Sequence, residues 1–397
     1  MKIVLTLIKT LTIMAILIVI AFEVISHKKQ QQKILVVHSY NKDLVWVNEI
    51  DEGIQRELST SGQASKVQVR YHYMNLKNNP DCNYYKNAAF DVAFTINNWQ
   101  PDVIIILDDL GQMLVGHPRI NTLSPEPLAE YTEPLAQLLS EGRCEPQSAA
   151  FFGLDKVSES TNPQIIFAGV NGGVENYGYL LADNVSGIFE HKNYAALVET
   201  LITLKNAAKL EKTNIIILND ESPTSLAELP NYHQFSWAPM ELSASHNVSL
   251  FKDWKAIVKK ANDEHALILT SNYQNIFDEE GKRISSSEVI SWTEDHAINP
   301  VLGANTNFVA DGGMISVAIS GIEQGEEAMG FALSFIDGSL VSQTKEAKQF
   351  TIGLSQSLVR KRNLKLPGIY EAFSREIGQF VPVSEHLYMN QSKDVNE

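Results

Sequence analysis

From residue 33 onward, short runs of apolar residues alternate with segments in which apolar residues recur at helical spacing. Several runs are almost unbroken Ile, Val and Leu, as expected for strands that are covered on both faces. The runs of strand length occupy residues 33–39, 66–74, 102–109, 164–171, 214–220, 266–272 and 300–305.

The segments between these runs carry apolar stripes, which predict amphipathic helices packed on a sheet. Alternation of strand and helix predicts a doubly wound parallel sheet of the α/β class. One series precedes residue 186 and a second follows it, so we expect two α/β lobes. The clearest stripes are Val47, Ile50, Ile54 and Leu58; Tyr194, Leu197, Leu201 and Leu204; and Phe251, Trp254, Val258 and Ala261.

The connection formed by residues 115–163 is long for a link between two strands and is rich in proline. We expect it to add a helix near residues 128–139 and loops beside the first lobe.

The N-terminus carries a topological signal. Lys2 and Lys9 precede an apolar stretch, residues 11–25, and two further lysines follow it. A charged flank before such a stretch is typical of a secretory signal. Counted from residue 3, the stretch reaches about 20 residues, enough to span a bilayer as a helix. A cleaved signal and a retained anchor both fit, and either predicts that the rest of the chain lies outside the cytoplasm.

Charge narrows the choice of partners. The formal net charge of the chain is −15, although its first 32 residues are positive. Such an acidic body repels phosphate backbones, so we expect no nucleic-acid partner. Cys82 and Cys144 are the two cysteines, and a disulfide between them fits the sequence as well as two separate buried thiols. No Cys/His spacing suggests zinc, and we expect no cofactor.

Polar and aromatic residues recur where the predicted strands end. Ligands of open parallel sheets bind beyond the carboxyl ends of the strands, so this placement suits a small polar ligand. These residues are His38, Ser39, Tyr40, Asn41 and Trp46; Asp108 and Asp109; Asn171, Gly172, Gly173 and Tyr177; Asn219, Asp220, Glu221 and Ser222; Ser271, Asn272 and Tyr273; and Asn305.

Each of these residues also has a structural reading. Ser39 or Asn41 fits a helix cap equally well, and Trp46 fits the core. Catalysis is the weaker reading, because the nucleophile-elbow, phosphate-loop and zinc-helix motifs are absent. Asp108 and Asp109 are neighbours in sequence and do not flank a bond as the two acids of a glycosidase do. We therefore expect a binding protein rather than an enzyme.

The stretch "ILVVHSYNKDLVWVNEIDEGI" resembles the opening of the extracytoplasmic substrate-binding proteins of the tryptophan/tyrosine ABC-transporter type, whose relatives include sensor domains beside histidine kinases. The stretches "PDVIIILDD", "PQIIFAGVNGG", "NVSGIFE" and "FVADGGMISVAISGIEQGEEAMGFALSFIDG" continue the resemblance to about residue 340. It implies a type I periplasmic-binding-protein fold, in which two α/β lobes joined by a multi-strand hinge close on a ligand.

On this resemblance, residues 1–32 form the signal or anchor and residues 386–397 a tail. Lobe 1 comprises residues 33–186 and about 306–345, and lobe 2 comprises residues 187–305 and about 346–385. The resemblance places the ligand-binding cleft at Ser39, Tyr40, Trp46, Asp108, Asp109, Asn171, Tyr177, Ser222, Asn272, Asn305 and Asp311.

The function implied is that of an extracytoplasmic protein that traps a small polar, amino-acid-like molecule for an ABC permease. A membrane-anchored sensory module that signals through a partner histidine kinase is the alternative, and a hydrolase comes after both. The chain departs from the family in the long proline-rich insert and in "NDESPTSLAELPNYHQF", both beside the expected cleft, so the ligand need not be the usual aromatic amino acid.

Overall fold

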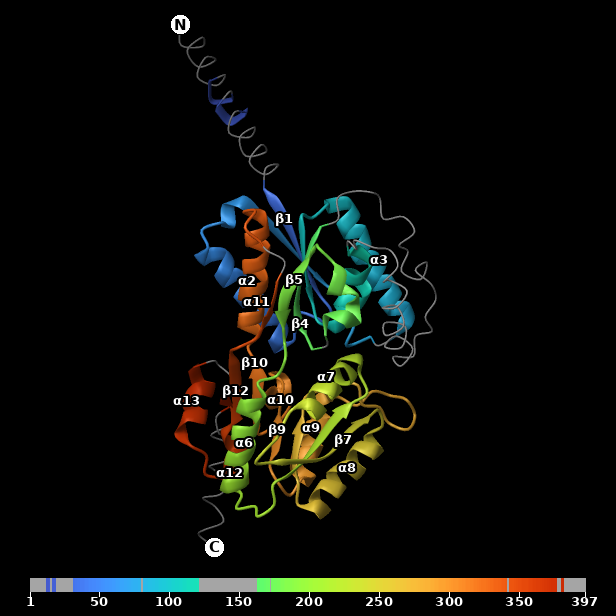
Figure 1. The fold of residues 1–397 in the computed structure, drawn as a ribbon, viewed down its shortest axis with the longest axis vertical. Coiled ribbons are helices and arrows are strands. Elements are labelled where there is room, and N and C mark those ends of the chain that lie inside the picture. Colours follow the sequence, from blue (N-terminus) through green and yellow to red (C-terminus); the bar gives the residue numbers. More distant parts are fainter. Residues whose placement is uncertain are drawn as a thin grey trace.

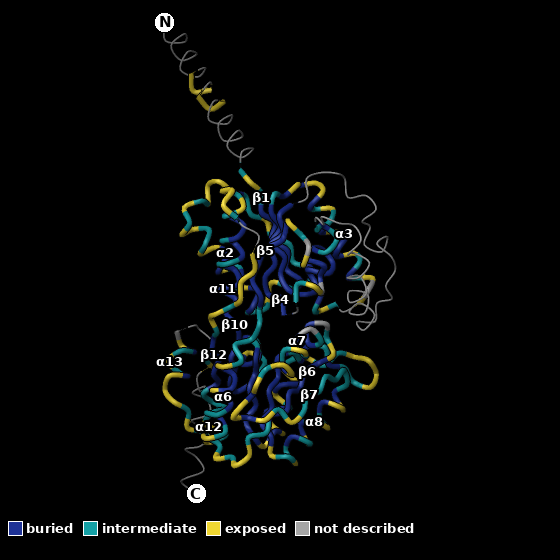
Figure 2. The backbone as a smooth tube through the Cα atoms, in the orientation of Figure 1, coloured by how far each residue is buried: buried dark blue, intermediate teal, exposed yellow. Residues whose placement is uncertain are grey.

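The computed structural model describes residues 12–14, 16–18, 31–79, 81–120, 163–171, 173–340, 343–376 and 380–381. Figure 1 shows two lobes stacked along the long axis of the molecule. The interior of each lobe is a buried sheet, drawn in dark blue in Figure 2. This confirms the expected two-lobed α/β architecture.

The first lobe is built on a parallel sheet with the strand order β11-β5-β4-β3-β1-β2. All residues of its central strands β3, β4 and β5 are buried, since helices cover both faces of the sheet. The strands are β1 (Gln32–His38), β2 (Val67–Tyr73), β3 (Val103–Leu107), β4 (Gln164–Val170), β5 (Val185–Phe189) and β11 (Thr344–Glu346).

Helices α2 (Val45–Thr60) and α11 (Gly321–Ile336) pack against each other on one face of this sheet, and α3 (Cys82–Trp99) lies on the other (Figure 1). The contact between α2 and α11 depends on glycine, because a Cβ at Gly53 or at Gly325 would overlap a backbone carbonyl of the other helix. A short helical turn, α4 (Asp109–Gly111), follows β3 directly.

The second lobe has the strand order β13-β12-β10-β9-β8-β6-β7. Apolar residues of α6, α12 and α13 pack on one face of this sheet, and those of α8, α9 and α10 pack on the other. The strands are β6 (Asn214–Asp220), β7 (Glu241–Val248), β8 (Leu267–Thr270), β9 (Val301–Gly303), β10 (Ile315–Ile319), β12 (Phe350–Ser355) and β13 (Phe380–Val381). The helices are α6 (Tyr194–Ala207), α7 (Pro223–Gln234), α8 (Phe251–Glu264), α9 (Ser286–His296), α10 (Asn307–Ala310), α12 (Gln356–Lys361) and α13 (Gly368–Glu376).

The expectation of a purely parallel second sheet is wrong at one pair, since β10 and β12 are antiparallel. The physical reason is the path of the chain. It leaves the second sheet at the end of β10, forms α11 and β11 of the first lobe, and re-enters beside its point of exit in the opposite direction.

In the part of the chain that the structure describes, three segments cross between the lobes: residues 190–193, the junction at Ser320, and residues 347–349. The start of α11 ties them together. The Glu323 carboxylate accepts the backbone N–H groups of Lys348 and Gln349 at 2.9 and 2.8 Å. The Gln324 amide donates to the carbonyl of Phe189, the last residue of β5, at 3.1 Å.

The sheets show where the crossings differ from the predicted boundaries. Strand β5 ends at Phe189, beyond residue 186, and β10 pairs in the second sheet, so the chain returns to the first lobe after Ile319 rather than near residue 306. We therefore propose that the boundaries between the two lobes lie at the crossing segments, after Phe189 and after Ile319.

Several expectations concern parts of the chain that the structure leaves undescribed. Residues 12–14 and 16–18 are helical and lie apart from both lobes (Figure 1), but most of the expected N-terminal helix lies outside the described residues. Among the helices that are described, none is long and apolar enough to cross a membrane. The helix expected near residues 128–139, the tail at 386–397, Cys144 and the Cys82 side chain also lie outside the described residues, so the disulfide stays a prediction.

Candidate functional site

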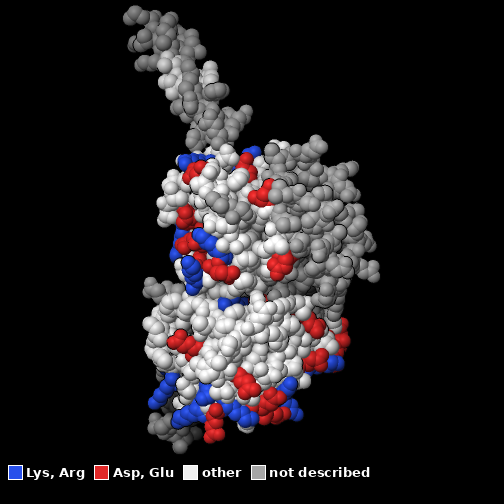
Figure 3. All heavy atoms as spheres, in the orientation of Figure 1, with Lys and Arg blue, Asp and Glu red and all other residues white. Residues whose placement is uncertain are grey.

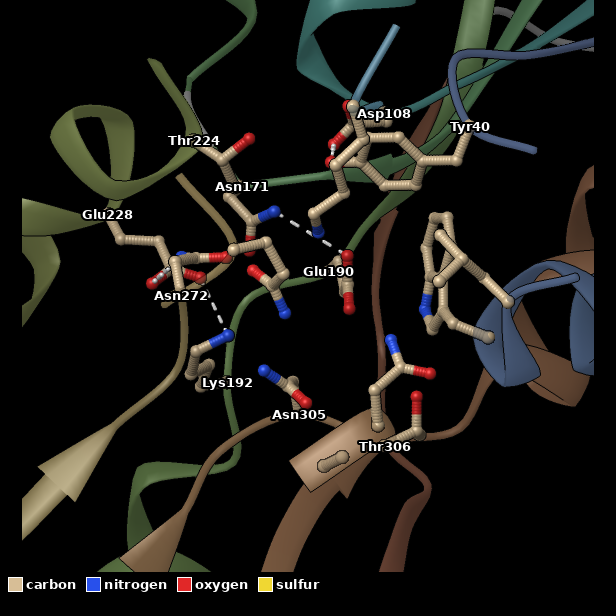
Figure 4. A pocket seen from close by; sticks show the side chains of 16 residues that line it. Tyr40, Asp108, Asn171, Glu190, Lys192, Thr224, Glu228, Asn272, Asn305 and Thr306 are labelled. Carbon is tan, nitrogen blue, oxygen red and sulfur yellow. Dashed lines mark hydrogen bonds and ion pairs between the residues drawn. The ribbon is translucent and has the colours of Figure 1, made fainter. Parts of the chain in front are cut away.

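A cavity lies between the two lobes, at the carboxyl ends of both sheets (Figure 4). Its volume is about 50 Å³. One water molecule needs about 10–15 Å³ of such volume, so the cavity has room for a few water molecules or a small ligand. On the face shown in Figure 3, the surface is creased between the lobes, and a basic side chain is visible in the crease. The residues that line the cavity are Tyr40, Leu44, Trp46, Lys77, Asp108, Asn171, Glu190, Lys192, Thr224, Glu228, Asn272, Gln274, Asn305, Thr306, Asn307 and Ala318.

Some of the residues predicted from the sequence meet at this cavity. They follow the ends of strands in both lobes, as the strand-end argument expected. They are Tyr40, Trp46, Asp108, Asn171, Asn272 and Asn305. Their part in ligand binding stays a prediction.

The other predicted residues of the first lobe lie behind the cavity wall. The Ser39 hydroxyl donates to the Leu107 carbonyl at 2.7 Å, which ties the end of β1 to the end of β3. The Tyr177 hydroxyl donates to the Asp109 carboxylate, and both side chains are buried. These contacts hold the wall in place rather than face the cavity.

Two predicted residues of the second lobe also have structural partners. Ser222 is the N-cap of α7, where its hydroxyl accepts the backbone N–H of Ser225. The Asp311 carboxylate accepts hydrogen bonds from the hydroxyls of Tyr273 at 2.9 Å and Ser287 at 3.4 Å. Asp311 therefore lies next to the cavity-lining residues without being one of them.

Asp108 has the most constrained position in the site. Its backbone has φ 71° and ψ 157°, a region that residues other than glycine rarely adopt, at a cost of about 1–3 kcal/mol. The side chain is 2% exposed, and Oδ1 accepts the Tyr40 hydroxyl at 2.7 Å. Burial, reinforced by the neighbouring Asp109 charge, raises the pKa of the Asp108 carboxyl well above its usual range.

Glu190 occupies the equivalent place after β5, at the start of the first crossing segment. Burial raises the pKa of its carboxyl to about 7, and the Lys192 ammonium partly opposes this shift. Its Oε2 accepts the Asn171 amide at 3.5 Å, and Figure 4 shows the carboxylate pointing into the centre of the cavity. The sequence reasoning missed Glu190 because β5 was not among the predicted strands.

Lys192 and Glu228 form a buried ion pair at 2.6 Å, with side chains 9% and 3% exposed. The other oxygen of Glu228 accepts the Tyr232 and Ser271 hydroxyls, both at 2.7 Å. The Glu228 carboxylate raises the pKa of Lys192 against the opposing effect of burial. Because α7 supplies Glu228 and the first crossing segment supplies Lys192, the pair anchors that segment to the second lobe.

Lys77 is a further residue that sequence patterns did not indicate, because it lies four positions beyond the end of β2. Its ammonium lies 4.4 Å from the centre of the Tyr40 ring. Burial lowers its pKa, although Asp108 acts in the opposite direction. The backbone carbonyl of Lys77 accepts the guanidinium of Arg283, from the second lobe, at 2.7 Å.

Some buried polar atoms of the cavity wall have no hydrogen-bond partner among the described residues. They come from both lobes, and a buried polar atom left unpaired costs about 1–3 kcal/mol, so each is a place for a ligand atom or water. They are Trp46 Nε1, Asp108 Oδ2, Asn171 Oδ1 and Thr306 Oγ1.

The described part of the chain contains no group of three or more His, Cys, Asp or Glu side chains arranged to hold a metal ion.

Comparison with protein-family models and with curated protein sequences found no match. Solved structures do match. A tryptophan-bound ABC domain from Streptococcus pneumonia has a TM-score of 0.56 at 12% identity, covering 88% of this chain and 100% of that one. A ligand-free, open substrate-binding protein with adhesive properties from Clostridium difficile has a TM-score of 0.56 at 11% identity, covering 89% and 99%.

A conserved domain protein from Vibrio cholerae is similar to the same extent, with a TM-score of 0.55 at 13% identity over 86% of this chain and 98% of that one. At these identities the likeness concerns the fold, and it extends over both lobes. The fold implied by the sequence resemblance is thereby confirmed: the chain has the two-lobed fold of the type I periplasmic binding proteins.

Proposed function

We propose that this chain is an extracytoplasmic solute-binding protein that holds a small polar molecule between its lobes for delivery to an ABC permease. The observation that carries the proposal is the set of buried, unpaired polar atoms on residues from both lobes that line one cavity. Fold similarity to a tryptophan-bound ABC domain and to a substrate-binding protein agrees with it.

Ligand capture would follow from the hinge. A ligand favours the closed arrangement only to the extent that it contacts both lobes. Asp108 and Asn171 belong to the first lobe, whereas Asn305 and Thr306 follow β9 of the second. A molecule that bonds to both pairs therefore links the lobes. The hydrogen bond from Arg283 to the Lys77 carbonyl adds a direct contact between the lobes.

The proposed location is outside the cytoplasm, with residues 1–32 as a signal or an anchor. Within the described part of that segment, Ile13, Met14, Ile16, Leu17 and Ile18 are all more than half exposed. Side chains of this kind on a helix apart from the lobes suit a lipid environment or a translocation machinery better than water.

The same exposed apolar residues favour a second candidate function, a membrane-anchored sensory module that signals through a partner histidine kinase. The ligand site would be unchanged, and occupancy would be passed on through the lobe arrangement. A binding role is preferred to hydrolysis because Asp108 and Asp109 face different surroundings, Asp108 the cavity and Asp109 the buried Tyr177 hydroxyl.

A thermal-shift screen of the full chain against amino acids, amines, nucleosides and small peptides tests the proposal, with small-angle scattering to follow lobe closure. We expect at least one class to raise the melting temperature and reduce the radius of gyration, and Asn305→Ala to weaken both effects. Chemical conversion of the bound ligand would instead indicate an enzyme. The solute-binding function would be rejected if no class of compound bound or closed the lobes.

A further inference from the structure

The first-lobe wall of the cavity is made by three neighbouring strand ends. Asp108 follows β3, Asn171 follows β4 and Glu190 follows β5, and the sheet order places these strands side by side. Figure 4 shows the three side chains around one region of the cavity. The wall therefore offers oxygen atoms from three directions.

The unpaired atoms at these three strand ends are oxygens, and the oxygens of an ionised carboxyl group and of an amide are hydrogen-bond acceptors. Asp108 Oδ2 and Asn171 Oδ1 are buried without a partner among the described residues, on side chains that are 2% and 4% exposed. The orientation of the Asn171 amide follows from its neighbours, because its nitrogen faces the Asp109 carboxylate at 3.4 Å and the Glu190 carboxylate at 3.5 Å. Its oxygen is consequently the atom left for a ligand.

A primary ammonium group matches such a wall, because it carries three N–H donors and no acceptor. A carboxylate or phosphate has only acceptors and would be repelled here. Hydrogen bonds from an ammonium to ionised oxygens are also shorter and stronger than those between neutral groups.

With Asp108, Glu190 and Lys77 in their ionised forms, the described residues that line the cavity carry an excess of one negative charge, and a bound cation favours the ionised carboxylates over the protonated forms that burial favours without it. Lys192 and Glu228 neutralise each other as an ion pair at 2.6 Å. Of the remaining lining residues, Asp108 and Glu190 are acidic and Lys77 is basic. Behind the wall, Asp109 adds further negative potential, and Asp220 and Asp311 act on Lys77 together with Arg283.

Apolar surfaces complete the cavity. The Tyr40 and Trp46 rings are tilted by 58° with their centres 6.1 Å apart, and Leu44 and Ala318 also line the space. These surfaces suit a short carbon chain, and the cavity volume of about 50 Å³ suits only a small molecule.

We propose that the cavity takes a small aliphatic primary amine of net positive charge, with its ammonium group between Asp108, Asn171 and Glu190. This inference rests on the solute-binding function proposed above and names the chemical class of its ligand. An anionic group on the ligand would be accommodated at Lys77, but the net charge of the bound molecule stays positive.

Isothermal titration of the full chain with L-ornithine and L-norleucine tests the inference, since the two have side chains of equal length and differ in one ammonium group. Putrescine serves as a cation without a carboxylate. We expect ornithine or putrescine to bind at least about tenfold more tightly than norleucine. Glu190→Gln should weaken binding of ornithine and of putrescine by about tenfold or more, and Glu199→Gln, which changes an exposed acid on α6, is the matched control.

Equal or tighter binding of norleucine would overturn the assignment, as would failure of both cations to bind. If an aromatic or other neutral amino acid bound in place of the cations, the proposal of a positively charged ligand would be rejected, but the solute-binding function would not. Only the absence of any bound solute and of lobe closure in the wider screen would reject that function.

Discussion

Replacement of Glu190 by Gln should make the ligand-free protein more stable, and increasingly so as the pH rises. Gln has nearly the same shape as Glu and can still accept the Asn171 amide, so the change mainly removes an ionisable group. Burial raises the pKa of Glu190 from an ordinary 4.5 to about 7, which means that the folded chain binds this proton more tightly than the unfolded chain does.

The size of the effect follows from this difference. Below about pH 4.5 the carboxyl is protonated in both states and contributes nothing to pH dependence. As the pH rises from 4.5 through about 7, the unfolded chain ionises first and the folded state loses stability. At 1.36 kcal/mol per pKa unit, the loss reaches roughly 2 kcal/mol near pH 6 and roughly 3 kcal/mol near pH 8, before any discount for solvent that reaches the side chain.

Urea denaturation followed by tryptophan fluorescence measures this directly. Wild type, Glu190→Gln and the exposed control Glu199→Gln would be compared without ligand at about pH 5 and about pH 8. The free energy of unfolding of Glu190→Gln should exceed that of wild type by a margin that grows with pH, while Glu199→Gln follows wild type. A constant margin, or one that shrinks as the pH rises, would refute the reasoning that Glu190 is held in a desolvated site.

Three further substitutions test other parts of the site. Asp108→Asn should weaken binding of a cationic ligand by about 1.5–3 kcal/mol, the value of a charge-assisted hydrogen bond, so unchanged calorimetric affinity would exclude its role. Lys192→Met should lower the free energy of unfolding by about 3–5 kcal/mol because it leaves the buried Glu228 carboxylate without a counter-charge, and the double variant with Glu228→Gln should recover much of the loss. Gly169→Ala should destabilise the chain by about 1–3 kcal/mol and weaken ligand binding, since φ is +66° there and the added Cβ would overlap the Trp46 ring; a thermal melt and an affinity equal to those of wild type would contradict this.

Several of the strands that the sequence predicted have long runs of β-branched and aliphatic residues. Strands β3 and β6 are examples, and their burial on both faces explains why the runs are so uniform. Strand β7 was missed because it is an edge strand whose residues are exposed or half-buried, so its sequence "ELSASHNV" carries no apolar run. Strand β5 was missed as a separate element although all of its residues are buried.

The residues of the site also divide into those that a sequence pattern could indicate and those that it could not. Asp108 and Asn171 could be found because each directly follows a recognised strand, and Glu190 would have been found by the same rule had β5 been predicted. Lys77 and Glu228 carry no such signal. One lies in a loop beyond β2, and the other lies within α7, where a sequence pattern cannot tell which residue faces the neighbouring lobe.

The sequence by itself determined the alternation of strands and helices, the presence of two lobes, and the collection of polar residues at strand ends. These are local properties, because the period of apolar residues and the residue after each strand can be counted along the chain. The tertiary structure alone decided which polar atoms meet. The crossings bring Glu190 and Lys192 between the lobes and make β12 antiparallel to β10. The packing of the first lobe leaves Asp108 and Asn171, which line the cavity, each with one unpaired oxygen. Convergence of this kind depends on how distant segments pack and on which hydrogen bonds that packing leaves unmade.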